Sequence, residues 1–110
     1  MQLLIPKSAL PDSDHAIRRL GYALHIDRRT HEKSYARRFG RDLFPRLHLY
    51  VEEKGDHYSL NLHLDQRAPI YVGVTAHSGD YDGPVVEKEM ERIKQEINKT
   101  IKQENRQIGD

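Results

Sequence analysis

The sequence predicts an α+β fold: an antiparallel sheet of three or four strands, with a short N-terminal helix and a long C-terminal helix on one face. Residues 22–27, 46–53 and 57–65 alternate apolar with other side chains, the pattern of half-buried antiparallel strands. Apolar residues recur at three- and four-residue steps after Pro84, which predicts the long helix. A chain of 110 residues is near the commonest domain size, so we expect residues 1–110 to form a single domain.

The short helix is expected over residues 13–20. It follows Pro11, and Asp12 and Ser13 offer the side-chain oxygens that cap helix N-termini. Gly21 is suited to end it, because glycine adopts the left-handed conformation found after helices. Residues 22–27 then follow as the first strand.

The next stretch, residues 27–46, is basic and less regular, and we expect only a helical turn around residues 34–39. Residues 46–53 and 57–65 are expected to pair as a hairpin around Gly55, which allows a tight turn. Pairing places leucines on one face and leaves polar or aromatic side chains on the other, among them His48, Tyr50, Asn61 and His63.

Residues 66–83 are rich in Gly, Pro, Asp and Ser, but residues 70–74 alternate and predict a short fourth strand before a loop at 76–83. The long helix begins at Pro84, and its apolar stripe is expected to cover the sheet. A dimer seam is the alternative, so either a monomer or a homodimer is compatible with the stripe. The stripe consists of Val86, Met90, Ile93, Ile97 and Ile101.

The composition of the chain limits the kinds of site, cellular location and partner that we expect. The chain has no cysteine, which excludes disulfides and thiolate metal sites and fits a cytoplasmic location. The apolar start at residues 3–5 is too short for a signal peptide or a membrane span, so we expect no membrane partner. The net charge is +1, but residues 1–50 carry +5 and residues 51–110 carry −4. That asymmetry indicates either an anionic partner or neutralisation of one half by the other.

Three histidines are expected on the polar side of the predicted strands: His25, His48 and His63. With Asp65 or Asp27 they offer zinc ligands. However, the chain lacks a His-x-His pair, and strand adjacency cannot be read from the sequence. Hydrogen-bonded histidines on a wet sheet face are therefore the expected state, with no cofactor or metal.

A second group of polar residues lies in the 76–83 loop. His77 and Ser78 are adjacent there, but neighbours in sequence rarely form the geometry of a serine hydrolase. Arginine pairs recur before and within the basic stretch, with aromatic residues between them, which is suited to phosphates and unpaired bases but lacks a specific nucleic-acid motif. A solvated basic face is the alternative for these arginines.

We therefore expect a small intracellular binding module without catalysis, which binds an anionic partner such as RNA or single-stranded DNA. The alternatives are a metal-dependent or acid–base enzyme using the His/Asp cluster and the 76–83 loop, and a protein-interaction or dimerisation module. The predicted binding surface comprises His25, Arg28, Arg29, Arg37, Arg38, His48, Tyr50, Asn61, His63, Asp65 and His77.

One stretch of the chain, residues 45–94, resembles a family of short uncharacterised bacterial hypothetical proteins. The residues that carry the resemblance are 61–66 (NLHLDQ), 75–83 (TAHSGDYDG) and 86–89 (VEKE). This resemblance covers under half of the chain and implies no activity, ligand or cofactor.

Overall fold

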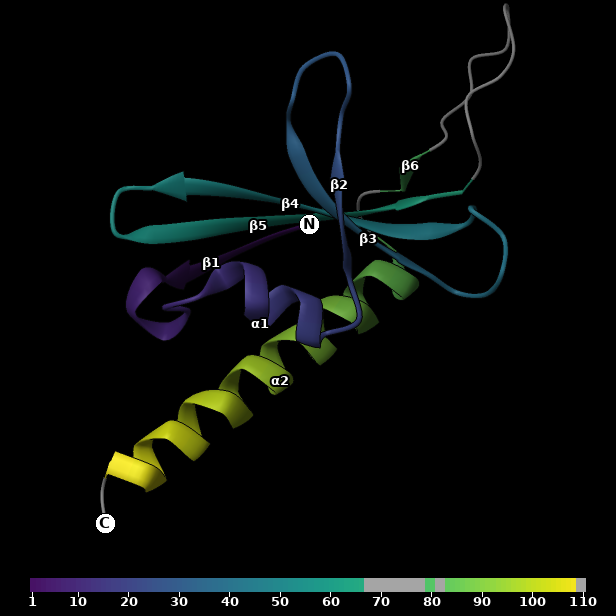
Figure 1. Cartoon of the computed structure of the whole chain (residues 1–110). Helices are drawn as coiled ribbons and strands as arrows, with labels where there is room; N and C mark the ends of the chain where they lie inside the picture. The colour runs from purple at the N-terminus through teal and green to yellow at the C-terminus, as the bar shows by residue number, and fades with distance from the viewer. Residues whose placement is uncertain (67–78, 81–82, 109–110) are drawn as a thin grey trace, which may run out of the picture.

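The computed structural model describes residues 1–66, 79–80 and 83–108 (Figure 1). A strand opens the chain, and the short helix comes after it. The elements in order are β1 (Gln2–Pro6), the 3-10 turn η1 (Lys7–Ala9), α1 (Ser13–Arg19), β2 (Ala23–Ile26), β3 (Lys33–Arg38), β4 (Arg46–Lys54), β5 (His57–Asp65), β6 (Gly79–Asp80) and α2 (Pro84–Ile108).

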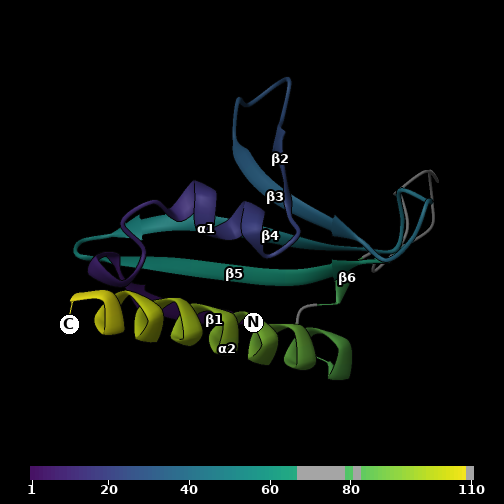
Figure 2. The ribbon, with the colours of Figure 1, turned by 60° about the horizontal axis from the view of Figure 1, so that its bottom comes forward.

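The strands form one antiparallel sheet in the order β1-β5-β4-β3-β2, and the two-residue β6 pairs with β5. The helix α2 runs along one side of this sheet, while the β2–β3 hairpin turns steeply away from β4 and β5 (Figure 2). The predicted α+β class, antiparallel sheet and C-terminal helix are confirmed. The predicted strand count is wrong, because β1 and β3 were not expected, and the short helix is not the first element.

Strand β1 pairs with the outer edge of β5, from Gln2 opposite Asn61 to Pro6 opposite His57. Its Ile5 is 6% exposed and belongs to the core, whereas Leu4 on the other face is 57% exposed. Three consecutive apolar residues do not show a strand period, so only the pairing with β5 reveals this element.

The prediction of a helical turn around residues 34–39 is wrong, because residues 33–38 form strand β3. It pairs with β2 on one side and β4 on the other, and Tyr35 lies opposite Leu49. Tyr35 is buried, and its hydroxyl donates to Asp14 Oδ1 of α1 at 2.7 Å. Burial between two strands decides the conformation here, since context outweighs a weak local preference.

The predicted β4–β5 hairpin is confirmed with a two-residue turn. Lys54 lies opposite His57, and Gly55 in the turn has a φ of 61°. The register pairs Leu47 with Leu64, Leu49 with Leu62 and Val51 with Leu60 on the apolar face.

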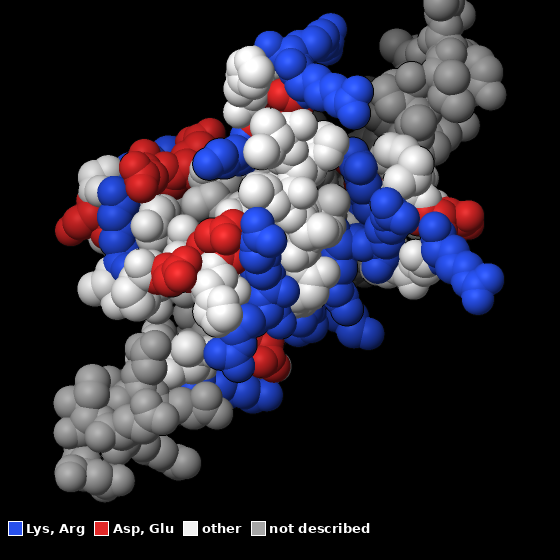
Figure 3. Space-filling model, viewed as in Figure 1, with Lys and Arg blue, Asp and Glu red and all other residues white. Residues whose placement is uncertain are grey.

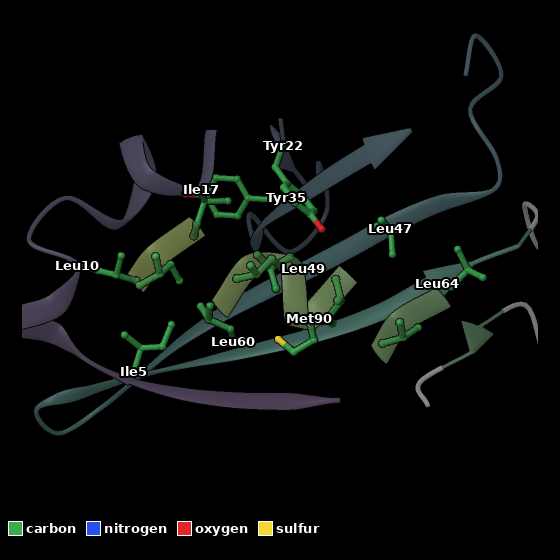
Figure 4. Packing of buried hydrophobic residues seen from close by; sticks show 14 residues of the cluster. Ile5, Leu10, Ile17, Tyr22, Tyr35, Leu47, Leu49, Leu60, Leu64 and Met90 are labelled. Atoms are coloured by element: carbon green, nitrogen blue, oxygen red, sulfur yellow. The ribbon is translucent and has the colours of Figure 1, made fainter. Parts of the chain in front are cut away.

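The helix α2 covers that apolar face, as its stripe predicts. Val86, Met90, Ile93 and Ile97 are at most 7% exposed and pack with Ile17 of α1 and the leucines of β4 and β5 (Figure 4). The stripe is therefore used within the chain. Among the described helices, none is long and apolar enough to cross a membrane.

Most of the region from residue 66 to residue 83 lies outside the described residues. The fourth strand expected at residues 70–74 lies outside the described residues, as does most of the loop at 76–83. Within that loop, Gly79 and Asp80 form β6, opposite Asp65 and Leu64.

Candidate functional site

The side of the sheet that faces away from α2, here called the polar face, gathers the predicted polar residues of β4 and β5. The antiparallel register places His48 opposite His63, Tyr50 opposite Asn61, and Arg46 opposite Asp65. Side chains directly opposite each other on one face of an antiparallel pair are in contact range. The hairpin alone therefore brings these side chains together.

The carboxylate of Asp65 is the centre of this arrangement. Its Oδ1 lies 2.8 Å from His63 Nε2, and its Oδ2 lies 3.1 Å from His48 Nδ1 and 3.2 Å from Arg46 Nε. The side chains of His48, His63 and Asp65 are only 9%, 12% and 17% exposed. A carboxylate this well shielded from water is stabilised by the charged guanidinium and by polar hydrogens directed at both oxygens.

Ser34 completes the arrangement from β3. Its Oγ lies 2.8 Å from His48 Nε2, so both ring nitrogens of His48 have polar partners. Ser34 was not among the predicted site residues, because a helical turn was expected there instead of the strand that places residue 34 on the polar face.

The order Ser34, His48, Asp65 is that of a hydroxyl–imidazole–carboxylate relay. A nucleophilic serine must reach its substrate, but Ser34 is 3% exposed. The geometry therefore favours Ser34 as a residue that orients the imidazole of His48.

Burial lowers the pKa of His48, although the negative charge of Asp65 acts in the opposite direction. The imidazole is therefore neutral near neutral pH, with one N–H and one lone pair. A neutral imidazole is the form that binds metal ions and accepts protons.

Aromatic rings lie beside this group. The ring centroids of His48 and Tyr50 are 4.5 Å apart, and those of Tyr50 and His63 are 5.6 Å apart in a stacked arrangement. The Arg46 guanidinium lies 4.6 Å from the centroid of Phe44. The polar face therefore combines aromatic rings with a guanidinium.

The other predicted residues are distributed around this centre. His25 lies opposite Ser34 across β2 and β3 and is exposed. Arg28 and Arg29 lie in the β2–β3 turn, which is held by Asp27 Oδ1 accepting from the backbone amides of Arg29 and Thr30. His77 lies outside the described residues.

The arginine pair at 37–38 is split between the two faces. Arg38 lies opposite Arg46 and is exposed. Arg37 lies opposite Leu47, and its guanidinium reaches Glu89 of α2 at 3.4 Å. Because strand side chains alternate, only Arg38 of the pair lies on the polar face.

Charge is separated along the molecule. In Figure 3, basic side chains gather toward the end of β3 and the turn that follows it, and acidic side chains gather toward the β4–β5 turn. The first region contains Arg38, Arg41 and Arg46, and the second contains Glu52, Glu53 and Asp56. The two halves of the sequence also neutralise each other in part, because Lys7 pairs with Glu53, Arg37 with Glu89 and Arg46 with Asp65.

No family model, no curated protein and no solved structure matches the chain.

Proposed function

We propose that the protein is a small, non-catalytic cytoplasmic module that binds single-stranded nucleic acid on its polar face. The observation that carries this proposal is the pairing of Arg38 with Arg46 across β3 and β4, next to the rings of His48, Tyr50 and His63. Two guanidiniums suited to phosphate thus lie beside a ring suited to stacking on a base.

Arg38 is the strongest candidate for a phosphate contact. It is exposed, and it makes no ion pair with any side chain of residues 1–66 and 83–101. Arg46 is already paired with Asp65, so we expect it to contribute mainly through its positive charge and by orienting that carboxylate. Of the three rings, Tyr50 is the one offered for stacking, because His48 and His63 are largely buried.

The chain has no cysteine and therefore no disulfide. This supports the proposed cytoplasmic location, because disulfides are rare in that reducing compartment. The charge separation supports an anionic partner, because an arginine-rich end attracts phosphates from a distance.

A metal-dependent or acid–base enzyme is a second candidate. It is favoured by the convergence of His48, His63 and Asp65 within hydrogen-bond distance, since such a group can hold a metal or transfer protons. The dimerisation module predicted as a third possibility is not favoured, because the stripe of α2 is buried against its own sheet.

Fluorescence anisotropy with short labelled RNA and single-stranded DNA tests the proposal. We expect binding to be tightest at low salt. The logarithm of the association constant should fall linearly with the logarithm of the salt concentration. The variant Arg38→Gln should bind more weakly and reduce the salt slope by about one phosphate contact.

The matched control is Arg19→Gln, which removes the same charge from an exposed position on α1, on the other side of the sheet. It should bind like the wild type. Absence of binding at low salt, or equal weakening by both variants, would overturn the proposal.

A further inference from the structure

Three potential metal ligands converge on the polar face from two adjacent strands. One ligand atom from each of His48, His63 and Asp65 lies within 4.8 Å of the other two. Ligands about 2.0–2.2 Å from a tetrahedral zinc ion are separated from one another by about 3.3 Å. The observed separations are slightly shorter than this: 3.1 Å from His48 Nδ1 to Asp65 Oδ2, and 2.8 Å from His63 Nε2 to the other carboxylate oxygen, Oδ1.

We propose that His48 Nδ1, His63 Nε2 and a carboxylate oxygen of Asp65 form a binding site for a divalent first-row metal ion such as Zn²⁺. Two imidazoles and one carboxylate suit Zn²⁺ far better than Mg²⁺ or Ca²⁺, which prefer oxygen ligands. Three protein ligands leave a coordination position open for water or an external ligand.

The surroundings of His48 allow it to change from hydrogen-bond donor to metal ligand. Because a carboxylate only accepts, the neutral ring without metal carries its proton on Nδ1, which lies 3.1 Å from Asp65 Oδ2, and Nε2 can then accept from the Ser34 hydroxyl at 2.8 Å. With metal at Nδ1, the ring proton resides on Nε2 and donates to the same hydroxyl, which can also accept. Ser34 thus satisfies the ring in both tautomers, as outer partners of metal-binding histidines do.

Strand geometry keeps the ligands in place. His63 and Asp65 are two residues apart on β5, so both point to the polar face, and the register sets His48 directly opposite His63. Ligands on two paired strands are held more firmly than ligands on loops, because the backbone ladder fixes their spacing.

Arg46 modulates the site. Its Nε lies 3.2 Å from Asp65 Oδ2, which orients the carboxylate, but its positive charge opposes a cation nearby. Replacing it by glutamine removes the charge and keeps a polar hydrogen. We therefore expect Arg46→Gln to bind the metal more tightly than the wild type.

The test uses the full chain without a purification tag, stripped with chelator and titrated with Zn²⁺ by calorimetry. We expect one ion per chain, and a Co²⁺ titration should give the strong visible absorption of a low-coordinate site with nitrogen ligands. Mg²⁺ should not compete. Absence of stoichiometric Zn²⁺ binding to the wild type would overturn the proposal.

Substitution of a proposed ligand tests whether the ion binds at this site. His63→Gln should weaken Zn²⁺ binding by about tenfold or more, the scale seen even for outer partners of metal ligands. The matched control is His57→Gln on the same strand, whose ring pairs with Asp56 at 2.8 Å on the exposed end of the hairpin. Equal losses in both variants would exclude the proposed site.

Tighter binding by Arg46→Gln cannot arise from misfolding, so it tests the site even where His63→Gln is unstable; unchanged or weaker binding would count against these ligands. The titrations contain no nucleic acid, and the anisotropy experiments can be run in chelator. Failure of the metal site and failure of nucleic-acid binding are therefore observed independently.

Discussion

The hydroxyl of Tyr22 donates a hydrogen bond of 2.5 Å to a carboxylate oxygen of Glu89, and thereby joins the residue just before β2 to α2. Glu89 is 5% exposed, and it also accepts from Arg92 Nε at 2.7 Å. The Arg92 guanidinium in turn donates to the carbonyl of Leu20. This buried polar group anchors α2 beneath the β2–β3 hairpin.

Loss of the Tyr22 hydroxyl should destabilise the fold. Tyr22→Phe keeps the buried ring but removes one donor to a charged carboxylate, which is expected to cost about 1.5–3 kcal/mol. Urea denaturation followed by circular dichroism measures the change. Tyr58→Phe is the control: its ring keeps the contact with Lys7, so its free energy of unfolding should match the wild type.

The stability of the protein should depend on the ionisation of Glu89. Burial raises the pKa of Glu89, but the hydrogen bonds from Arg92 and Tyr22 outweigh it and hold this pKa below the ordinary value of 4.5. A lowered carboxyl pKa stabilises the fold fully above pH 4.5, and this contribution is lost as the pH falls through the folded-state value.

Unfolding measured across this range should therefore show a steeper loss of stability for the wild type than for Glu89→Gln. Glu91→Gln, an exposed neighbour on α2, should retain the steep loss. Parallel curves for the wild type and Glu89→Gln would contradict this role of Glu89.

Packing of α2 should dominate the stability of the sheet. Ile93 is 0% exposed in the core, and Ile93→Ala is expected to cost about 2–5 kcal/mol by loss of burial and formation of a cavity. Val85 on the same helix is 44% exposed, and Val85→Ala should change stability by about 0.5 kcal/mol or less. Denaturation of the two variants makes the comparison, and similar effects would show that the apolar stripe is not what holds the helix to the sheet.

Stacking on Tyr50 should contribute to nucleic-acid binding. Tyr50→Leu removes the ring from the polar face and is expected to weaken binding of a short single strand by about 1–3 kcal/mol. Tyr58→Leu changes a ring of the same kind that lies opposite Glu53 near the β4–β5 turn. Anisotropy titrations should show a loss for the first variant alone; unchanged binding by Tyr50→Leu would place the ligand elsewhere.

The prediction from sequence was most accurate where the hydrophobic period of the strands and a turn signal indicated the same element. The β4–β5 hairpin follows from two alternating runs around Gly55, and the same alternation placed His48, Tyr50, Asn61 and His63 together. The stripe of α2 likewise predicted the face that packs on the sheet. In each case one local pattern determines which side chains are buried.

The remaining features depend on contacts between distant segments. Leu3, Leu4 and Ile5 become a strand only because the edge of β5 is available to pair with them. Ser34 joins the site because residues 33–38 are held between two strands, which no local pattern revealed. Glu89 pairs with Arg92 one turn along α2, but its burial depends on contacts with Tyr22 and Arg37, which lie far from it in the sequence.

The split of Arg37 and Arg38 has a consequence for the tolerance of this chain to insertions and deletions. One arginine supports the interior through Glu89, and its neighbour lies on the proposed ligand-binding surface. Removing or adding a single residue within β3 would exchange their sides, placing the wrong residue in each position. The number of residues in β3 is thus more constrained than the amino acid at each position. A variant that replaces both arginines at once could not distinguish a loss of folding from a loss of binding.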